Sequence, residues 1–137
     1  MDLDTKKGTK SEYKKTFSDE EVLLFSKIIG DNNPIHVDSK YAAKSIFGKK
    51  IIHGVLINGM VSKIFGTQYP GKGSIYLTQN SKFLKPVFVG EEITARVILS
   101  EFDKKRNRGV FITECFNTNN EMVFEGNATI LFPKTYD

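Results

Sequence analysis

The chain has 137 residues, which is enough for one domain with a buried core that needs no disulfide or structural metal. Its 20 lysines and arginines against 16 aspartates and glutamates give a net charge of +4, an excess too small to argue for nucleic acid as a partner. The single cysteine, the charged N-terminus and the lack of a membrane-spanning apolar run predict a cytoplasmic protein that does not enter a membrane.

The first part of the chain predicts a strand followed by a helix. We expect one domain over residues 1–137, with the polar residues 1–10 flexible and a strand over about 11–17. Ser18 to Glu21 has the form of a capping box, which indicates the start of a helix. The apolar residues that follow at helical spacing form one stripe, and Gly30 is placed to end the helix.

The next segment, 31–36, reads DNNPIH and carries the most chemistry in the chain. Pro34 fixes its own φ and keeps Asn33 out of the helical region, so a bent loop should present both Asp31 and His36. A carboxylate beside a histidine is the minimum equipment for holding and deprotonating a water molecule at neutral pH. Because the chain has only two histidines, this pairing predicts an enzyme.

The remaining elements predict a sheet wrapped around one helix. A short helix is expected over 39–47, and a buried helix over 51–65 whose small residues allow close approach of a backbone or a ligand. From residue 73 onward the apolar pattern has a period of two, with strands expected over 74–84, 92–102, 109–117 and 122–132. The sequence therefore predicts an α+β fold with a mostly antiparallel sheet around a long central helix, and dimerisation to cover the sheet's remaining surface.

Four segments resemble one family of enzymes. Residues 31–38 read DNNPIHVD, which is similar to the D-x-N-P-[LIV]-H-x-[DE] signature of the MaoC-like, (R)-specific enoyl-CoA hydratases. Residues 53–56 (HGVL) match the family's helix start, and residues 70–77 and 83–91 resemble strand and turn segments of its short single-domain members. The resemblance covers about residues 17–132.

The resemblance implies a hot-dog fold, with an active site at the interface of a homodimer or higher homo-oligomer. It also implies reversible hydration of a short-chain trans-2-enoyl-CoA to a (3R)-hydroxyacyl-CoA, with CoA as part of the substrate and no separate cofactor. Asp31 and His36 would share the reacting water, and which of them is the base stays open. The backbone N–H of Gly54 would stabilise the developing enolate oxygen.

Other residues receive roles from their matched positions. Ser62 is a candidate for lining the site, and its alternative role is a hydroxyl bonded back to its own helix. Phe65 and Ile130 are candidates for walls of an acyl pocket, where a phenylalanine would favour short chains. Asn33 and Pro34 are expected to structure the loop. His53 could cap the start of its helix or face the site, and we favour the structural role.

Three alternatives use the same fold. The first is a (3R)-hydroxyacyl-acyl-carrier-protein dehydratase, which applies the same chemistry to a different carrier. The second is a non-catalytic acyl-CoA-binding protein, against which the intact Asp31 and His36 argue, and the third is a thioesterase. A metal site formed by Asp31, His36 and His53 is also conceivable, because two histidines and a carboxylate can bind iron, but we expect no metal.

Overall fold

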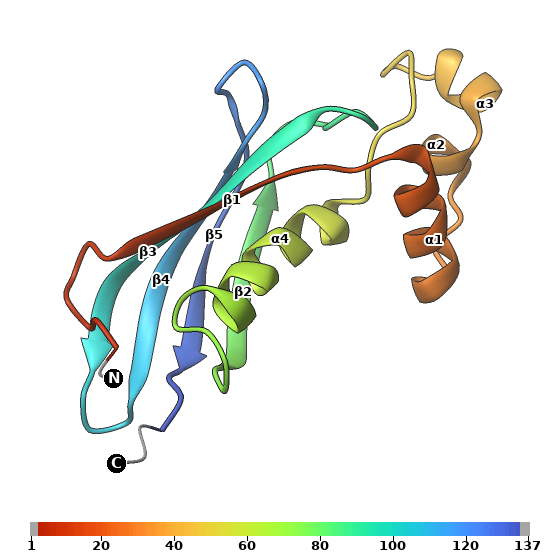
Figure 1. The fold of residues 1–137 in the computed structure, drawn as a ribbon. Helices are drawn as coiled ribbons and strands as arrows, with labels where there is room; N and C mark the ends of the chain where they lie inside the picture. The colour runs from red at the N-terminus through yellow and green to blue at the C-terminus, as the bar shows by residue number, and fades with distance from the viewer. Residues whose placement is uncertain (1–2, 135–137) are drawn as a thin grey trace.

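A long helix lies against one face of a curved sheet in the computed structural model, which describes residues 3–134 (Figure 1). The elements in chain order are β1 (Lys10–Thr16), α1 (Asp19–Ile29), α2 (Pro34–Val37), α3 (Ser39–Ala43), α4 (Gly54–Thr67), β2 (Ile75–Phe83), β3 (Glu92–Asp103), β4 (Arg108–Phe116) and β5 (Met122–Leu131). The five strands form one sheet in the order β1-β3-β4-β5-β2, and every neighbouring pair is antiparallel. This is the predicted α+β hot-dog architecture.

The core lies between α4 and the sheet. On β3 the alternate residues Ile93, Ala95, Val97 and Leu99 are fully buried, as their period of two predicts. The single cysteine, Cys115, is also buried there, and desolvation raises the pKa of its thiol to about 12. Because a thiol in that environment stays protonated, the structure confirms Cys115 as a small apolar core residue.

Helix α4 begins three residues later than predicted, at Gly54. Ile51 and Ile52 are outside the helix because their backbone N–H groups donate to the carbonyl oxygens of Ile35 and Val87, at 3.2 and 2.8 Å. These two hydrogen bonds tie the segment before α4 to the loops on both sides of it. The first turn of α4 is therefore placed by tertiary contacts that periodicity does not reveal.

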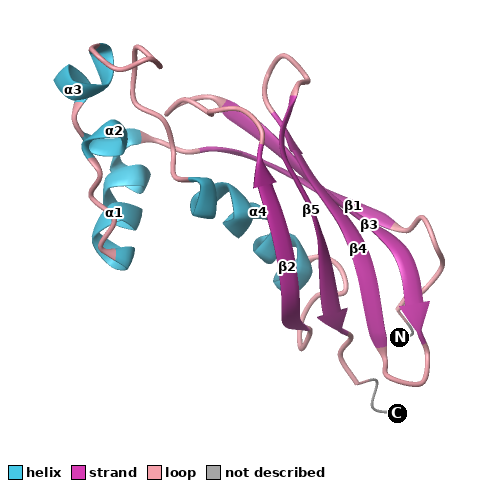
Figure 2. Ribbon diagram, turned by 180° about the vertical axis from the view of Figure 1, so that it is seen from behind, coloured by secondary structure: helices cyan, strands magenta, loops and turns pink. Residues whose placement is uncertain are grey.

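Helices α1, α2 and α3 form a lobe that stands apart from the sheet, at one end of the molecule (Figure 2). The capping box at Ser18 and Glu21 begins α1 as predicted, and Gly30 ends it in the left-handed conformation. The apolar stripe of α1 is only partly covered, since Val22 is buried but Leu23, Ile28 and Ile29 are 46, 71 and 46% exposed. The lobe thus presents uncovered apolar surface in the single chain.

The N-terminal segment makes contacts from residue 3 onward, whereas the first two residues of the expected flexible segment 1–10 lie outside the described residues. Leu3 packs against the core, and the Gly8 N–H donates to the Leu99 carbonyl at 2.8 Å. None of the described helices combines the length and hydropathy needed to cross a membrane.

Candidate active site

A pocket of about 490 Å³ opens between the lobe, the start of α4 and the end of β2. Asp31, His36 and Gly54 all line it, so the structure brings together the three residues that the sequence predicts as a carboxylate, an imidazole and an oxyanion donor. His53 also lines it, and the rest of the wall is mostly apolar, from residues 51–57 and 83–87. The pocket thus combines a few polar groups with an apolar lining, as is typical of sites for small organic substrates.

The loop that carries Asp31 is held by its own side chains. Gly30 has φ +80°, which turns the chain out of α1 and directs Asp31 into the pocket. The Asn33 N–H donates to Oδ1 of Asp31 at 3.2 Å, and Oδ1 of Asn33 accepts from the Ile35 N–H at 3.2 Å. Pro34 occupies the first position of α2, where its missing N–H has no consequence. The predicted bent loop is therefore a short turn of helix that begins at Pro34 and carries His36.

The tautomer of His36 follows from one hydrogen bond. Its Nδ1 lies 2.7 Å from the carbonyl oxygen of Ile51, and because a carbonyl can only accept, Nδ1 carries the proton. In the neutral ring Nε2 then has the free lone pair. Burial lowers the pKa of His36 below its ordinary value of 6.5, against the opposing effects of the Ile51 hydrogen bond and of Asp31. At neutral pH this side chain is a proton acceptor.

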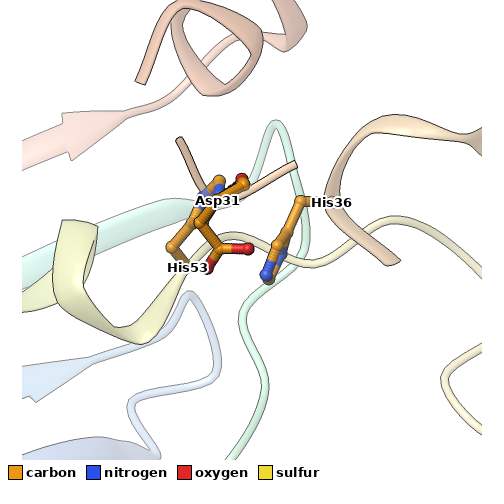
Figure 3. Close-up of side chains that lie close together, drawn as sticks. All are labelled: Asp31, His36 and His53. Atoms are coloured by element: carbon orange, nitrogen blue, oxygen red, sulfur yellow. Dashed lines mark hydrogen bonds between the residues drawn. The ribbon is translucent and has the colours of Figure 1, made fainter. Parts of the chain in front are cut away.

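Asp31 places a carboxylate next to that acceptor. Figure 3 shows its carboxylate turned toward the ring of His36. A carboxylate oxygen of Asp31, a ring nitrogen of His36 and a ring nitrogen of His53 all lie within 4.8 Å of one another. The Asp31 side chain is exposed, so the carboxylate can also reach a water molecule in the pocket. One water molecule can therefore donate one hydrogen to the Asp31 carboxylate and the other to Nε2 of His36.

The backbone N–H of Gly54, at the start of α4, supplies a donor in the lining of the same pocket. As the first residue of α4 it has no partner within the helix, and no other acceptor in residues 3–134 takes its hydrogen. A Cβ at this position would lie 2.8 Å from the ring of Phe83, so a glycine here leaves the backbone N–H uncovered without displacing that ring. The dipole of α4 adds partial positive charge at the same place.

His53 is the residue of this site to which sequence reasoning assigned too small a part. It precedes α4 at the capping position, but its side chain makes no capping hydrogen bond. Instead its Nε2 lies 3.0 Å from both Ser26 Oγ and the Asp31 carbonyl, and its ring stacks on His36 with centroids 3.8 Å apart. The available signal was that the chain's second histidine directly precedes Gly54 in a segment that resembles the family.

The Asp31, His36 and His53 cluster is poorly arranged for a metal ion. The two imidazole rings are stacked, with planes 24° from parallel. Because a nitrogen lone pair lies in the plane of its ring, the lone pairs of two stacked rings stay in separate planes and do not converge on one metal ion. The donor set fits proton chemistry better than it fits metal ligation.

Three predicted substrate contacts are placed elsewhere. Ser62 is exposed on α4, beyond the described lining of the pocket. Phe65 and Ile130 are buried in the core, where Phe65 meets Tyr76 and Phe111 edge to face at centroid distances of 5.3 and 4.9 Å. In the single chain these residues are separate from the pocket, and their roles as substrate contacts stay predictions.

Comparison with known proteins gives consistent matches over the chain. The chain is 36% identical to the (R)-specific enoyl-CoA hydratase of Rhodospirillum rubrum over 95% of its length and 90% of the relative's. It is 32% identical to a mitochondrial 3-hydroxyacyl-[acyl-carrier-protein] dehydratase of Arabidopsis thaliana over 87% of its length and 72% of the relative's. The solved (R)-hydratase of Aeromonas caviae, described as involved in PHA biosynthesis, superposes with a TM-score of 0.92 at 36% identity and covers 93% of this chain and 97% of its own. Residues 3–121 match the model of the MaoC like domain, and the chain therefore belongs to the MaoC-like family.

Proposed function

We propose that this protein is an (R)-specific enoyl-CoA hydratase, which adds water reversibly to a short-chain trans-2-enoyl-CoA to give a (3R)-hydroxyacyl-CoA. The observation that carries the proposal is the grouping of the Asp31 carboxylate, the His36 Nε2 lone pair and the Gly54 N–H around one pocket. Its shared identity with hydratases over nearly the whole chain supports the same reaction.

In the proposed mechanism, one water donates its two hydrogens to Asp31 and to Nε2 of His36. The water oxygen attacks the β-carbon while His36 takes its proton, and the electron pair of the double bond moves through the α-carbon to the thioester oxygen. Gly54 N–H donates to that oxygen, which bears the enolate charge. The imidazolium of His36 then returns the proton to the α-carbon, so that one water has been added across the double bond and the enzyme is unchanged.

The arrangement supports His36 as the base and Asp31 as the residue that orients the water. His36 is neutral at pH 7 because burial lowers the pKa of its ring, and its Nδ1–H is held by Ile51. Asp31, as a carboxylate nearby, also stabilises the imidazolium that forms during the reaction. No cofactor takes part in these steps apart from the CoA of the substrate.

A second candidate is a dehydratase that acts on acyl-carrier-protein thioesters, which the identity with the Arabidopsis relative favours. The same three groups would perform the reverse reaction on a 3-hydroxyacyl group. The two candidates differ in the carrier that must dock outside the pocket. Rates with matched CoA and carrier-protein thioesters therefore separate them.

We include a homodimer, or a higher homo-oligomer, in the proposal. Strand β2 lies at one edge of the sheet, and it carries exposed apolar side chains at Ile75, Leu77 and Phe83, which are 52, 38 and 52% exposed. Together with the uncovered stripe of α1, this is apolar surface of the kind that a second copy would bury. Analytical ultracentrifugation should give twice the chain mass or more, and a monomer at micromolar concentration would contradict this part of the proposal.

The single buried thiol is consistent with the cytoplasm as the compartment.

The direct test is hydration of crotonyl-CoA by the purified protein, followed through the loss of the enoyl-thioester absorbance. A dehydrogenase specific for one enantiomer should identify the product as (3R), and Asp31→Asn should abolish the signal. If crotonyl-CoA and crotonyl-acyl-carrier protein are both left unchanged by the wild-type protein, the proposed function is wrong.

A further inference from the structure

Ser26 and His53 form a buried polar pair directly behind the pocket. Among the described residues only three polar side chains are buried, and two of them are Ser26 and His53, at 2 and 1% exposed. Ser26 lies on α1 and His53 directly precedes α4, so their contact joins the lobe to the body of the domain. The proposed chemistry does not use either side chain.

The hydrogen bonds of this pair have a defined direction. The Asp31 carbonyl can only accept, so Nε2 of His53, 3.0 Å away, carries the proton and donates it. Ser26 Oγ, also 3.0 Å from Nε2, is then a second acceptor of the same N–H. The single ring N–H of His53 thus donates to the Asp31 backbone and also to Ser26, which lies on α1.

The ring of His53 also sets the position of His36. The two rings stack at 3.8 Å, and the edge of the His36 ring is held by its Nδ1–H donating to Ile51. A flat neighbour at this distance fixes the plane in which Nε2 of His36 points. His53 therefore touches both members of the proposed pair, one through its backbone and the other through its ring.

A histidine kept only for packing would be a poor choice at this position. Its Nδ1 is buried without a hydrogen-bond partner in the described part of the chain. An unpaired buried nitrogen costs stability, and a phenylalanine of similar shape would avoid that cost. A histidine at position 53 thus leaves a buried Nδ1 unpaired, while its Nε2 donates a hydrogen bond to the Asp31 carbonyl.

We propose that His53, anchored by Ser26, is a positioning residue for the hydration reaction. It holds the Asp31 backbone by its Nε2–H and the His36 ring by stacking, and it does not touch the substrate. The inference rests on the proposed function, which supplies the roles of Asp31 and His36. Removal of groups that orient metal ligands typically costs about 10- to 100-fold in activity, and we expect a loss of the same size for a group that orients Asp31 and His36.

Two substitutions of His53 separate its two contacts. His53→Phe keeps a flat ring and removes the donor, and we expect kcat to fall about 100-fold with KM changed less than threefold. His53→Gln keeps an N–H donor and removes the ring, and it should restore part of the loss, to within about tenfold of wild type. Ser26→Ala keeps both contacts of His53 but frees it from α1, and should lower kcat about three- to tenfold.

Thr113→Val is the matched control, because Thr113 is the third buried polar residue and accepts from Gln79 Nε2 at 3.0 Å on the sheet. It should lower the melting temperature and leave kcat unchanged. Wild-type kcat in His53→Phe, or in both His53→Gln and Ser26→Ala, overturns the proposal. If His53→Phe does not fold, the other two variants decide the question alone.

Failure of the proposed function can be told apart from failure of this inference. Long-range ¹H–¹⁵N spectra of the wild-type protein report the tautomers of both histidines without any substrate. We expect a proton on Nε2 of His53, donated to the Asp31 carbonyl, and a proton on Nδ1 of His36, donated to the Ile51 carbonyl. A His53 ring protonated on Nδ1 in the wild type would refute the positioning role, whatever the enzyme's substrate is.

Discussion

Replacing Gly54 by alanine tests the oxyanion role directly, because it adds one methyl group beside the proposed donor. The new Cβ would lie 2.8 Å from Cε1 and 2.9 Å from Cδ1 of Phe83, which is closer than real contacts of this kind. Phe83 is 52% exposed, so its ring can turn away at little cost. We therefore expect Gly54→Ala to keep an unchanged fold.

The expected effect is on turnover. A methyl group at this point keeps the thioester oxygen from the Gly54 N–H, and a displacement of about 1 Å at a reacting centre costs about 100-fold. That factor corresponds to about 2.7 kcal/mol of activation free energy. Initial rates of crotonyl-CoA hydration over a range of concentrations should therefore show a reduced kcat in Gly54→Ala.

Gly59→Ala is the matched control on the same helix. A Cβ at Gly59 meets nothing within 4 Å, so this variant should keep wild-type kcat and melt at a slightly higher temperature. In the double variant Gly54→Ala/Phe83→Ala there is no Phe83 ring for the new methyl group to displace, and we expect the loss of kcat to persist. Wild-type kcat in Gly54→Ala would refute the oxyanion assignment, and full recovery in the double variant would assign the effect to Phe83.

Four further predictions concern the pair, the pH, the metal and the chain length. Asp31→Asn or His36→Ala should lower kcat by about two to four orders of magnitude with an unchanged circular dichroism spectrum, and near-normal rates in either would remove the mechanism. Because burial lowers the pKa of His36, its neutral form persists below pH 6.5, so the acid limb of kcat/KM should lie below that of an ordinary histidine. As the pH falls, the His36 ring is protonated in the unfolded chain before it is protonated in the folded protein. The contribution of His36 to stability is therefore present above about pH 6.5 and is lost as pH falls through the lower folded pKa. A melting temperature that falls over this range of pH would agree with the expected direction. Dialysis against a strong chelator should leave the rate unchanged, whereas a loss restored by a divalent ion would favour a metal at Asp31 and His36. Phe65→Ala should extend the usable acyl chain while lowering stability by about 3–5 kcal/mol, and an unchanged chain-length profile would leave Phe65 a core residue only.

Local patterns predicted most of the elements because each rests on a short-range cause. The capping box at Ser18 and the left-handed Gly30 define α1 from neighbouring residues alone, and the period of two in β3 follows from burial of one sheet face. The start of α4 could not be predicted in this way. Ile51 and Ile52 are apolar and fit helical spacing, but hydrogen bonds to residues 35 and 87 hold them outside the helix.

The sequence by itself determined the α+β class, the loop at Asp31 and His36, and the family, because a signature of fixed spacing in one short segment survives without knowledge of the fold. Only the tertiary structure decided which nitrogen of His36 is free, since that depends on a carbonyl 15 residues away. It also decided that His53 lies between Ser26, Asp31 and His36, through contacts that span up to 27 residues. Hydrogen-bond direction and ring stacking are properties of atoms brought together from separate segments, and spacing along the chain does not contain them.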